Sequence, residues 1–275
     1  MEVKIHIPHV ALQPFVLNIS TVKVVLPEGL PEVVTPYPPT PFQSMLFYCN
    51  DPVSMSGVDE VNFRKQPFSV MLGPQFSRVN IKVHRQLRAI RVDFVPGGMY
   101  RIFGIPMLEL FDKGFDVQDL LGPEIGIINN YLQNITDLDE GKNIVEKFLL
   151  KRLQNAKTKL PFDSAMQLLL HLHGKLSVEE TASLSCLSIK QFERTCKDRI
   201  GMNPKMYARI LKFSKAYRLR ENFPEMSWTA IGYESGYYDQ MHLIRDFKVF
   251  AGVNPSVIAS ELLQTPIRMQ KDLPM

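Results

Sequence analysis

The chain repeats one pattern, RTCKDRIGMNP at residues 194–204 and RDFKVFAGVNP at residues 245–255. Arg, Lys, Gly, Asn and Pro recur here at a constant offset of 51 residues, as from Arg194 to Arg245. Upstream the match continues at an offset of 50 residues, with Ser177 against Ser227. Internal similarity of this length is uncommon by chance, so residues 177–255 are expected to contain two copies of one structural unit.

Each copy predicts two short helices around a tight turn. A residue suited to N-capping precedes each helix, apolar residues at helical spacing give it a buried face, and a glycine followed by Asn-Pro ends the unit. Such a pair is a helix-turn-helix, whose second helix enters the major groove of DNA. The expected N-caps are Ser177, Ser188, Ser227 and Asp239, and the expected core residues of the second helices are Phe192, Cys196, Leu243 and Phe247.

A long helix is expected between the two units, from 204 to about 222. At 1.5 Å per residue it would be roughly 28 Å long, and successive turns of one DNA groove lie about 34 Å apart. A helix of this length could hold two recognition helices one DNA turn apart in one polypeptide. Asp163 is expected to cap a further helix, from Ser164 to His173, that joins the first unit.

The second copy, IGYESGYYDQMHLIRDFK at residues 231–248 followed by GVNP at 252–255, resembles the signature of the AraC-type transcription regulators. The first copy is a looser match, and the resemblance covers roughly the last third of the chain. Two positions depart from the family pattern: Gly232 stands where the family has Ala, and Cys186 where it has Gly. Gly232 should cost about 1 kcal/mol of helix propensity, and Cys186 means that the first turn cannot rely on a glycine with positive φ.

The resemblance also implies which residues face the DNA. Arginine suits guanine, glutamine suits adenine, glutamate suits cytosine, and isoleucine or methionine suits a thymine methyl group, whereas phosphate contacts fix position without reading sequence. The expected base-contacting residues are Lys190, Glu193 and Arg194 in the first unit, and Gln240, Met241, Ile244 and Arg245 in the second; the expected phosphate contacts are Ser188, Lys197 and Lys248.

Less specific interpretations of these residues stay open. Arg194 and Arg245 could be ordinary solvated side chains, although their recurrence at matched positions favours DNA. Glu193 is costly near phosphates and could instead pair with Lys190. Met241 and Ile244 could lie in a domain interface rather than contact bases.

The first half of the chain predicts a β-rich domain. Short alternating or apolar runs at 42–49, 68–72, 79–83 and 89–95 are typical of strands in a small barrel or sandwich. In the last run, Ile90, Val92 and Phe94 share one face, and Arg91 and Asp93 the other. The proline-rich residues 1–40 favour extended or edge-strand conformations. A polar stretch at 153–162 predicts a domain linker.

A second resemblance concerns PGGMYRIFGIP at residues 96–106. It is similar to a motif in the domain that precedes the DNA-binding part in a subset of AraC-type regulators, where helices like those expected at 116–122 and 138–153 follow. This resemblance implies a sensor-like or dimerisation domain over residues 1–155, followed by a DNA-binding domain over 160–265 with units at about 177–200 and 227–251. The expected fold class is α+β: a β-rich barrel-like or sandwich-like domain with a few helices, then an all-α tandem helix-turn-helix domain.

Charge is unevenly divided along the chain. Residues 1–152 carry 15 Lys and Arg against 16 Asp and Glu, and residues 153–275 carry 17 against 12, which makes the C-terminal part basic by a net of five. A basic region is the electrostatic footprint expected of a nucleic-acid binder. It supports the assignment weakly on its own.

Catalytic, metal and cofactor signals are missing from the sequence. Cys49, Cys186 and Cys196 have neither CxxC spacing nor histidine partners, and Cys186 and Cys196 are expected to be small buried apolar residues. Neither GxSxG nor HExxH occurs, and Gly97-Gly98 is expected to form a turn rather than a phosphate loop. No apolar run reaches 18 residues and no signal peptide is evident, so neither a membrane nor a metal is expected, and the location is expected to be cytoplasmic.

The leading hypothesis is a sequence-specific DNA-binding transcription regulator that is not an enzyme. Its expected partner is double-stranded DNA, with a small-molecule ligand of the N-terminal domain, a homodimer and, for an activator, RNA polymerase as further possible partners. One alternative is a protein-interaction module in which the tandem units no longer bind DNA. Another is an enzymatic N-terminal domain fused to a DNA reader, which a metal bound to the purified protein would support.

Overall fold

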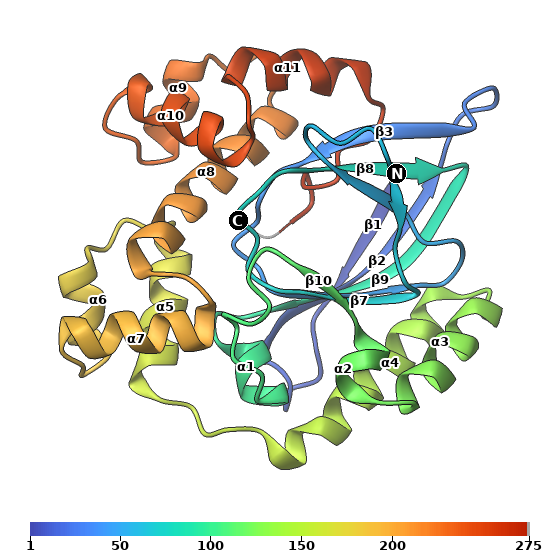
Figure 1. Ribbon diagram of the computed structural model, residues 1–275, viewed down its shortest axis with the longest axis horizontal. Coiled ribbons are helices and arrows are strands. Elements are labelled where there is room, and N and C mark those ends of the chain that lie inside the picture. The colour runs from blue at the N-terminus through green and yellow to red at the C-terminus, as the bar shows by residue number, and fades with distance from the viewer. Residues whose placement is uncertain (274–275) are drawn as a thin grey trace.

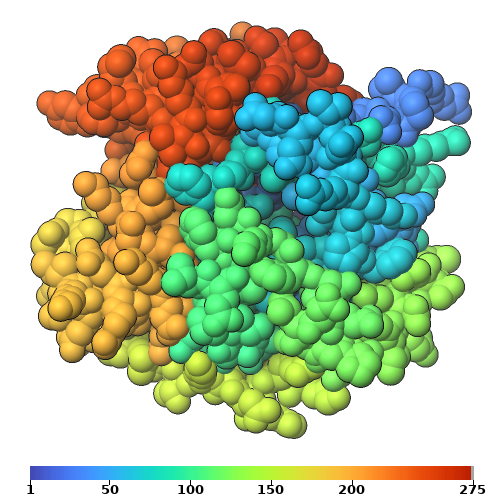
Figure 2. Space-filling model, viewed as in Figure 1, coloured from blue at the N-terminus to red at the C-terminus, as the bar shows by residue number. Residues whose placement is uncertain are grey.

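The computed structural model describes residues 1–273, and its fold is α+β as predicted (Figure 1). Among the described residues, an antiparallel β-structure with four α-helices and one short 3₁₀ helix occupies the N-terminal part, and seven α-helices from Pro161 onward form the C-terminal part. The C-terminal helices, yellow to red, lie along one side and one end of the β-structure (Figure 2).

Two antiparallel sheets face each other in the N-terminal part. In the six-stranded sheet the order is β1 (Glu2–His6), β2 (Val16–Val25), β9 (Gln86–Phe94), β4 (Ser44–Tyr48), β7 (Ser69–Leu72) and β10 (Gly114–Asp116). In the four-stranded sheet it is β3 (Glu32–Tyr37), β8 (Val79–His84), β5 (Ser54–Gly57) and β6 (Arg64–Lys65). Residues 1–40 form extended strands as expected: the proline-containing β3 is an edge strand, and β2 is an inner strand between β1 and β9.

Strand β9 shows how the alternating sequence is used. Ile90, Val92 and Phe94 pack on one face of the six-stranded sheet together with apolar residues of α3 (Glu124–Asn134) and α4 (Leu138–Arg152). The opposite face, with Arg91 and Asp93, points between the two sheets, where both side chains are buried. The polar face of β9 therefore lines the space between the two sheets. The remaining helices of this part are α1 (Gly98–Phe103), α2 (Val117–Leu121) and the short 3₁₀ helix η1 (Leu153–Asn155).

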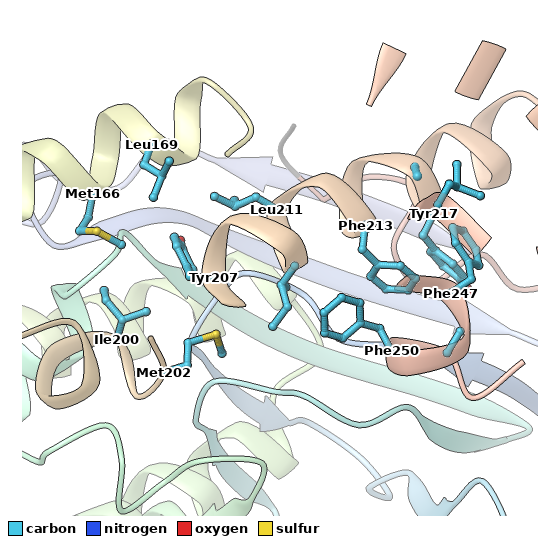
Figure 3. Close-up of a cluster of buried hydrophobic side chains, with 14 of the residues drawn as sticks. Met166, Leu169, Ile200, Met202, Tyr207, Leu211, Phe213, Tyr217, Phe247 and Phe250 are labelled. Carbon is cyan, nitrogen blue, oxygen red and sulfur yellow. The ribbon is translucent and has the colours of Figure 1, made fainter. Parts of the chain in front are cut away.

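The C-terminal helices share one apolar core. They are α5 (Pro161–His171), α6 (Val178–Leu184), α7 (Ile189–Ile200), α8 (Pro204–Asn222), α9 (Trp228–Glu234), α10 (Gln240–Phe250) and α11 (Pro255–Gln264). Figure 3 shows this core running along α8, from Met166 and Leu169 on α5 to Phe247 and Phe250 on α10. Burial of apolar area on both sides of α8 thus holds the two helix pairs in one cluster.

Three local expectations were wrong. Helix α5 begins at Pro161 instead of Ser164, and Asp163 lies inside its first turn, where Oδ2 accepts a hydrogen bond from the Leu160 backbone N–H at 2.7 Å. Proline suits the first helical turn because the missing N–H would have no partner there.

The expectation that Cys186 is buried was also wrong. Cys186 is exposed, because it lies in the turn between α6 and α7 instead of in a core. It also adopts a positive φ of 54° without being glycine.

No helix within residues 1–273 is long and apolar enough to cross a membrane. Over the same residues, no group of three or more His, Cys, Asp or Glu side chains is arranged to hold a metal ion.

Candidate nucleic-acid interface

Both helix pairs have the caps that their sequences predict. The hydroxyl of Ser177 accepts from the Glu180 N–H at 3.1 Å and that of Ser227 accepts from the Ala230 N–H at 3.2 Å, so the first helix of each pair begins one residue after its serine. The second helices begin in the same way after Ser188 and Asp239. Capping satisfies N–H groups that have no partner within the helix.

The second helix of each pair divides into a buried and an exposed face. On α7, Phe192 and Cys196 are fully buried, and on α10, Leu243 and Phe247 are fully buried. These side chains form the core with α8, which leaves the opposite face of each helix open to solvent. A recognition helix needs this division, because its outer face must reach into the groove.

The structure places the predicted base-contacting residues on these two outer faces. All are exposed except Ile244, which is half-buried, and Met241 has 57% of its surface exposed. They lie in the N-terminal two turns of each helix, the part that contacts base edges in helix-turn-helix proteins. The residues are Lys190, Glu193 and Arg194 on α7, and Gln240, Met241, Ile244 and Arg245 on α10.

The predicted phosphate contacts lie beside them. Lys197 and Lys248 are exposed, each three residues beyond the matched arginine and so about one turn further along its helix. Ser188 is exposed as well, but its hydroxyl is already engaged with Gln191, to whose Oε1 it donates at 2.9 Å. The backbone N–H of Ser188 donates to the same Gln191 oxygen at 3.1 Å, so both donors of Ser188 are engaged in the helix cap.

Two exposed aromatic residues beside the second unit were missed in the sequence. Tyr238, directly before the cap Asp239, has 95% of its surface exposed, and Tyr233 near the end of α9 has 82% exposed. Tyrosine hydroxyls donate hydrogen bonds to phosphates. The sequence signal for their exposure was their position outside the apolar spacing that predicts the core of this helix pair.

Helix α8 is tied to the second recognition helix by a polar network. Arg209 on α8 donates through Nε and Nη2 to Oδ1 of Asp246 on α10, at 3.1 and 2.7 Å, and Tyr237 donates to the other carboxylate oxygen at 3.1 Å. At the far end of α8, the Arg220 guanidinium lies 4.2 Å from the centre of the Trp228 ring of α9. The second unit is thus fixed to α8 at two points.

The N-terminal part holds the C-terminal end of each recognition helix. Gln43 donates through Nε2 to the carbonyls of Arg199 and Ile200 at 3.3 and 3.2 Å, at the end of α7. Arg78 donates to the carbonyl of Ala251, just past the end of α10, at 3.4 Å and forms an ion pair of 2.8 Å with Glu261 on α11. Hydrogen bonds from the N-terminal part therefore hold both helices at the end opposite to their base-contacting turns.

A buried ion pair also holds the C-terminal end of α7 in place. Arg199 near the end of α7 lies 3.0 Å from both carboxylate oxygens of Asp163 on α5, and Asp163 is completely buried. The same guanidinium lies 5.1 Å from the ring centre of Tyr100 on α1. The pair connects α7 of the first unit to α5, and the contact of Arg199 with Tyr100 extends this connection to α1 of the N-terminal part.

Two parts of the chain match models of known protein families. Residues 181–260 match the family model of a helix-turn-helix domain, which is of the AraC type. Residues 181–260 therefore carry an AraC-type helix-turn-helix domain. Residues 4–116 match the model of a domain of unknown function, DUF6597. The AraC-type domain supports a DNA-binding transcription regulator and points away from an enzyme.

Solved structures with similarity to the chain include three regulators. ToxT from Vibrio cholerae O395 is 12% identical, with 86% of this chain and 99% of that chain covered and a TM-score of 0.45. The DNA-binding domain of AdpA, a global transcriptional factor solved with a target DNA, is 21% identical, covering 40% of this chain and 100% of that chain with a TM-score of 0.37. The AraC-like transcriptional activator CuxR is 10% identical, covering 65% and 70% with a TM-score of 0.26. No curated protein matches the chain.

Proposed function

We propose that this chain is a transcription regulator that reads an asymmetric duplex site with two unequal helix-turn-helix units. The observation that carries the proposal is the pair of exposed N-terminal faces on α7 and α10, each backed by a buried face on the shared core. The first face offers Lys190, Glu193 and Arg194, and the second Gln240, Met241, Ile244 and Arg245. Two different faces in one polypeptide read two different sequences.

Within this proposal the chain divides into a sensor-like or dimerisation part over residues 1–155 and a DNA-binding part over 160–265. The hydrogen bonds from Gln43 and Arg78 to the ends of α7 and α10 support a controlling role for the first part, because a shift of the β-structure would move both recognition helices. A small ligand or a second copy of the chain would be the source of that shift. For an activator, RNA polymerase would be a further partner.

The salt dependence of binding to random-sequence duplex DNA tests this proposal. Lysine and arginine contacts to phosphates release counterions, so the logarithm of affinity falls linearly with the logarithm of salt concentration, with a slope of about −0.9 for each phosphate contact. A steep fall of this kind is expected for the full chain. Absent or salt-independent binding would contradict the proposal and favour a protein-interaction module.

A further inference from the structure

The sequence PGGMYRIFGIP at residues 96–106 forms helix α1 and the turns on either side of it. Together with the next residue, Met107, it is called the α1 segment. Figure 1 shows α1 beside the β-structure, on the side where the linker and α7 lie. The α1 segment contacts three later parts of the chain, which are the linker, α5 and α7. It therefore lies where the N-terminal and C-terminal parts meet.

Arg101 on α1 holds the linker that follows η1. Its Nε donates to the Lys157 carbonyl at 3.2 Å, and its own carbonyl accepts from the Lys157 backbone N–H at 2.8 Å. The same guanidinium donates through Nη1 to the Pro14 carbonyl at 2.9 Å, and Arg101 is only 4% exposed. Both backbone polar groups of Lys157 are thus bonded to one residue of α1, which fixes the linker at this point.

Tyr100, the preceding residue, lies beside two cations. Nζ of Lys157 is 3.8 Å from the centre of its ring, and the Arg199 guanidinium is 5.1 Å from it. Both distances are within the range over which an aromatic ring attracts a cation. Arg199 belongs to the C-terminal end of α7, and its guanidinium also pairs with Asp163 of α5. One ring therefore contacts the linker and the first recognition helix.

The two ends of the α1 segment also reach the first unit. At its beginning, a Cβ placed on Gly97 would lie 2.8 Å from Oδ1 of Asp163, the oxygen that accepts from Arg199 at 3.0 Å. Only a residue without a Cβ allows the backbone to approach the ion pair so closely. At its end, the Met107 backbone N–H donates to the carbonyl of Asp198 on α7 at 2.8 Å.

We infer that the α1 segment sets the position of the first recognition helix relative to the β-structure, and that Tyr100 is a positioning residue that acts through Lys157 and Arg199. The second unit is held by a different contact, from Arg78 to the Ala251 carbonyl. The α1 segment thus acts on one of the two units. As a device for reading DNA it rests on the proposed function, but its effect on position is measurable without DNA.

Limited trypsin digestion of the folded full chain tests the hold on the linker. Trypsin cleaves after lysine, and Lys157 must leave the Tyr100 ring and the Arg101 backbone before a protease can bind it. Cleavage follows the population of such open states when closing is faster than cleavage. Tyr100→Leu is expected to speed cleavage after Lys157 about fivefold, because the attraction of the ring for two cations is lost.

Two control variants separate this effect from a general loss of packing. Tyr100→Phe keeps the ring and should be cleaved at the parent rate. Phe103→Leu makes a similar change on the same helix, but the ring of Phe103 packs against Phe94 of the β-structure, with ring centres 6.0 Å apart. It should therefore leave the cleavage rate after Lys157 unchanged.

Two spin labels measure the position of the first unit in the full chain. Cys186, exposed in the turn before α7, takes one label, and Asn130→Cys at an exposed position of α3 takes the other. Cys49 and Cys196 are buried and should not react. Double electron–electron resonance should give one narrow distance distribution for the labelled parent. Tyr100→Leu should broaden it, whereas Tyr100→Phe and Phe103→Leu should keep the parent width.

Gly97→Ala tests the close approach to Asp163. Its Cβ would push against the carboxylate, so the distance distribution should broaden. The matched control is Gly122→Ala, because Gly122 also has a positive φ, 93° against 77°, but a Cβ there would meet no atom of the described chain within 4 Å apart from its chain neighbours. This control carries the same backbone strain and should keep the parent width.

A parent-like distribution in either Tyr100→Leu or Gly97→Ala would overturn the inference. Faster cleavage in Tyr100→Leu without a broader distribution would do so too, since the α1 segment would then hold the linker alone. If one of these variants does not fold, the other decides. DNA affinity is measured on the same preparations. Broadening in a protein without DNA affinity would uphold this inference and remove the proposed function, and DNA affinity with parent-like distances would do the reverse.

Discussion

Cys186 and Gly236 occupy the same left-handed position in the two units. Each follows the serine that ends the first helix of its pair, and their φ angles are 54° and 79°. The turn geometry therefore requires a positive φ whether or not the sequence supplies glycine. A side chain with a Cβ pays about 1–2 kcal/mol to adopt this conformation.

Cys186→Gly should consequently stabilise the protein. Relief of the left-handed strain is partly offset by the greater entropy of glycine in the unfolded chain, so a gain of about 0.5–1 kcal/mol is expected. Urea denaturation measures it. The matched control is Gly236→Ala, which introduces the strain and should lower the free energy of unfolding by a similar amount; equal stability of both variants and the parent would contradict the account.

Gly232→Ala should also be stabilising. Gly232 is buried inside α9, and a Cβ placed there would lie 3.4 Å from Cδ1 of Leu243, an ordinary van der Waals distance. Alanine has a helix propensity about 1 kcal/mol better than glycine. We expect a higher melting temperature with unchanged DNA affinity, and a lower one would mean that the space beside Leu243 is tighter than its distance implies.

Arg245→Ala should relax base preference at one position of the site. Arg245 is exposed on the outer face of α10, and a bidentate contact of arginine to guanine contributes about 1–3 kcal/mol of discrimination. Binding to a panel of single-base variants of the selected site measures the effect. If the preference is the same at every position, Arg245 does not read a base.

Lys248→Ala is the matched comparison on the same helix. A phosphate contact carries no sequence information, so the substitution should weaken binding to all duplexes about equally and reduce the salt slope by about one. Titrations at several salt concentrations give the slope. A loss confined to one sequence would assign Lys248 to base reading instead.

Stability should fall as the pH rises from about 4.5 to about 8 because of Glu221. Burial raises the pKa of the Glu221 carboxyl from 4.5 to about 8, against the opposing charges of Arg268 and Arg218, while Asp272 adds to the rise. The folded protein thus binds more protons than the unfolded chain in this window. The contribution to the free energy of unfolding is fully present below pH 4.5 and is lost through pH 8, with a slope of at most about 1.4 kcal/mol per pH unit.

Glu221→Gln measures this contribution. The amide cannot ionise and still accepts from the Gln270 backbone N–H, so the variant should lose the decline between pH 4.5 and 8 that the parent shows. Chemical denaturation at a series of pH values provides the comparison. An identical pH profile in parent and variant would assign the titration to another group.

The sequence predicts the DNA-binding part better than the β-structure, for physical reasons. Caps such as Ser227 and core spacings such as Leu243 to Phe247 are local signals, and the structure has the corresponding helices at the expected positions. The alternation of β9 predicts two faces, but it cannot say that Arg91 and Asp93 face another sheet, because that depends on pairing between distant strands. The contacts of Gln43 with α7 and of Gln270 with α8 join residues far apart in the chain, and no local pattern encodes them.

The central claim is that two unequal faces in one chain read one asymmetric site. Selection of binding sites from random duplex DNA by the full-length protein, at two salt concentrations, tests it most directly. The account predicts an enriched motif with two different blocks about one helical turn, roughly 34 Å, apart. A palindromic motif, a motif with a single block, or no enrichment at either salt concentration would contradict it.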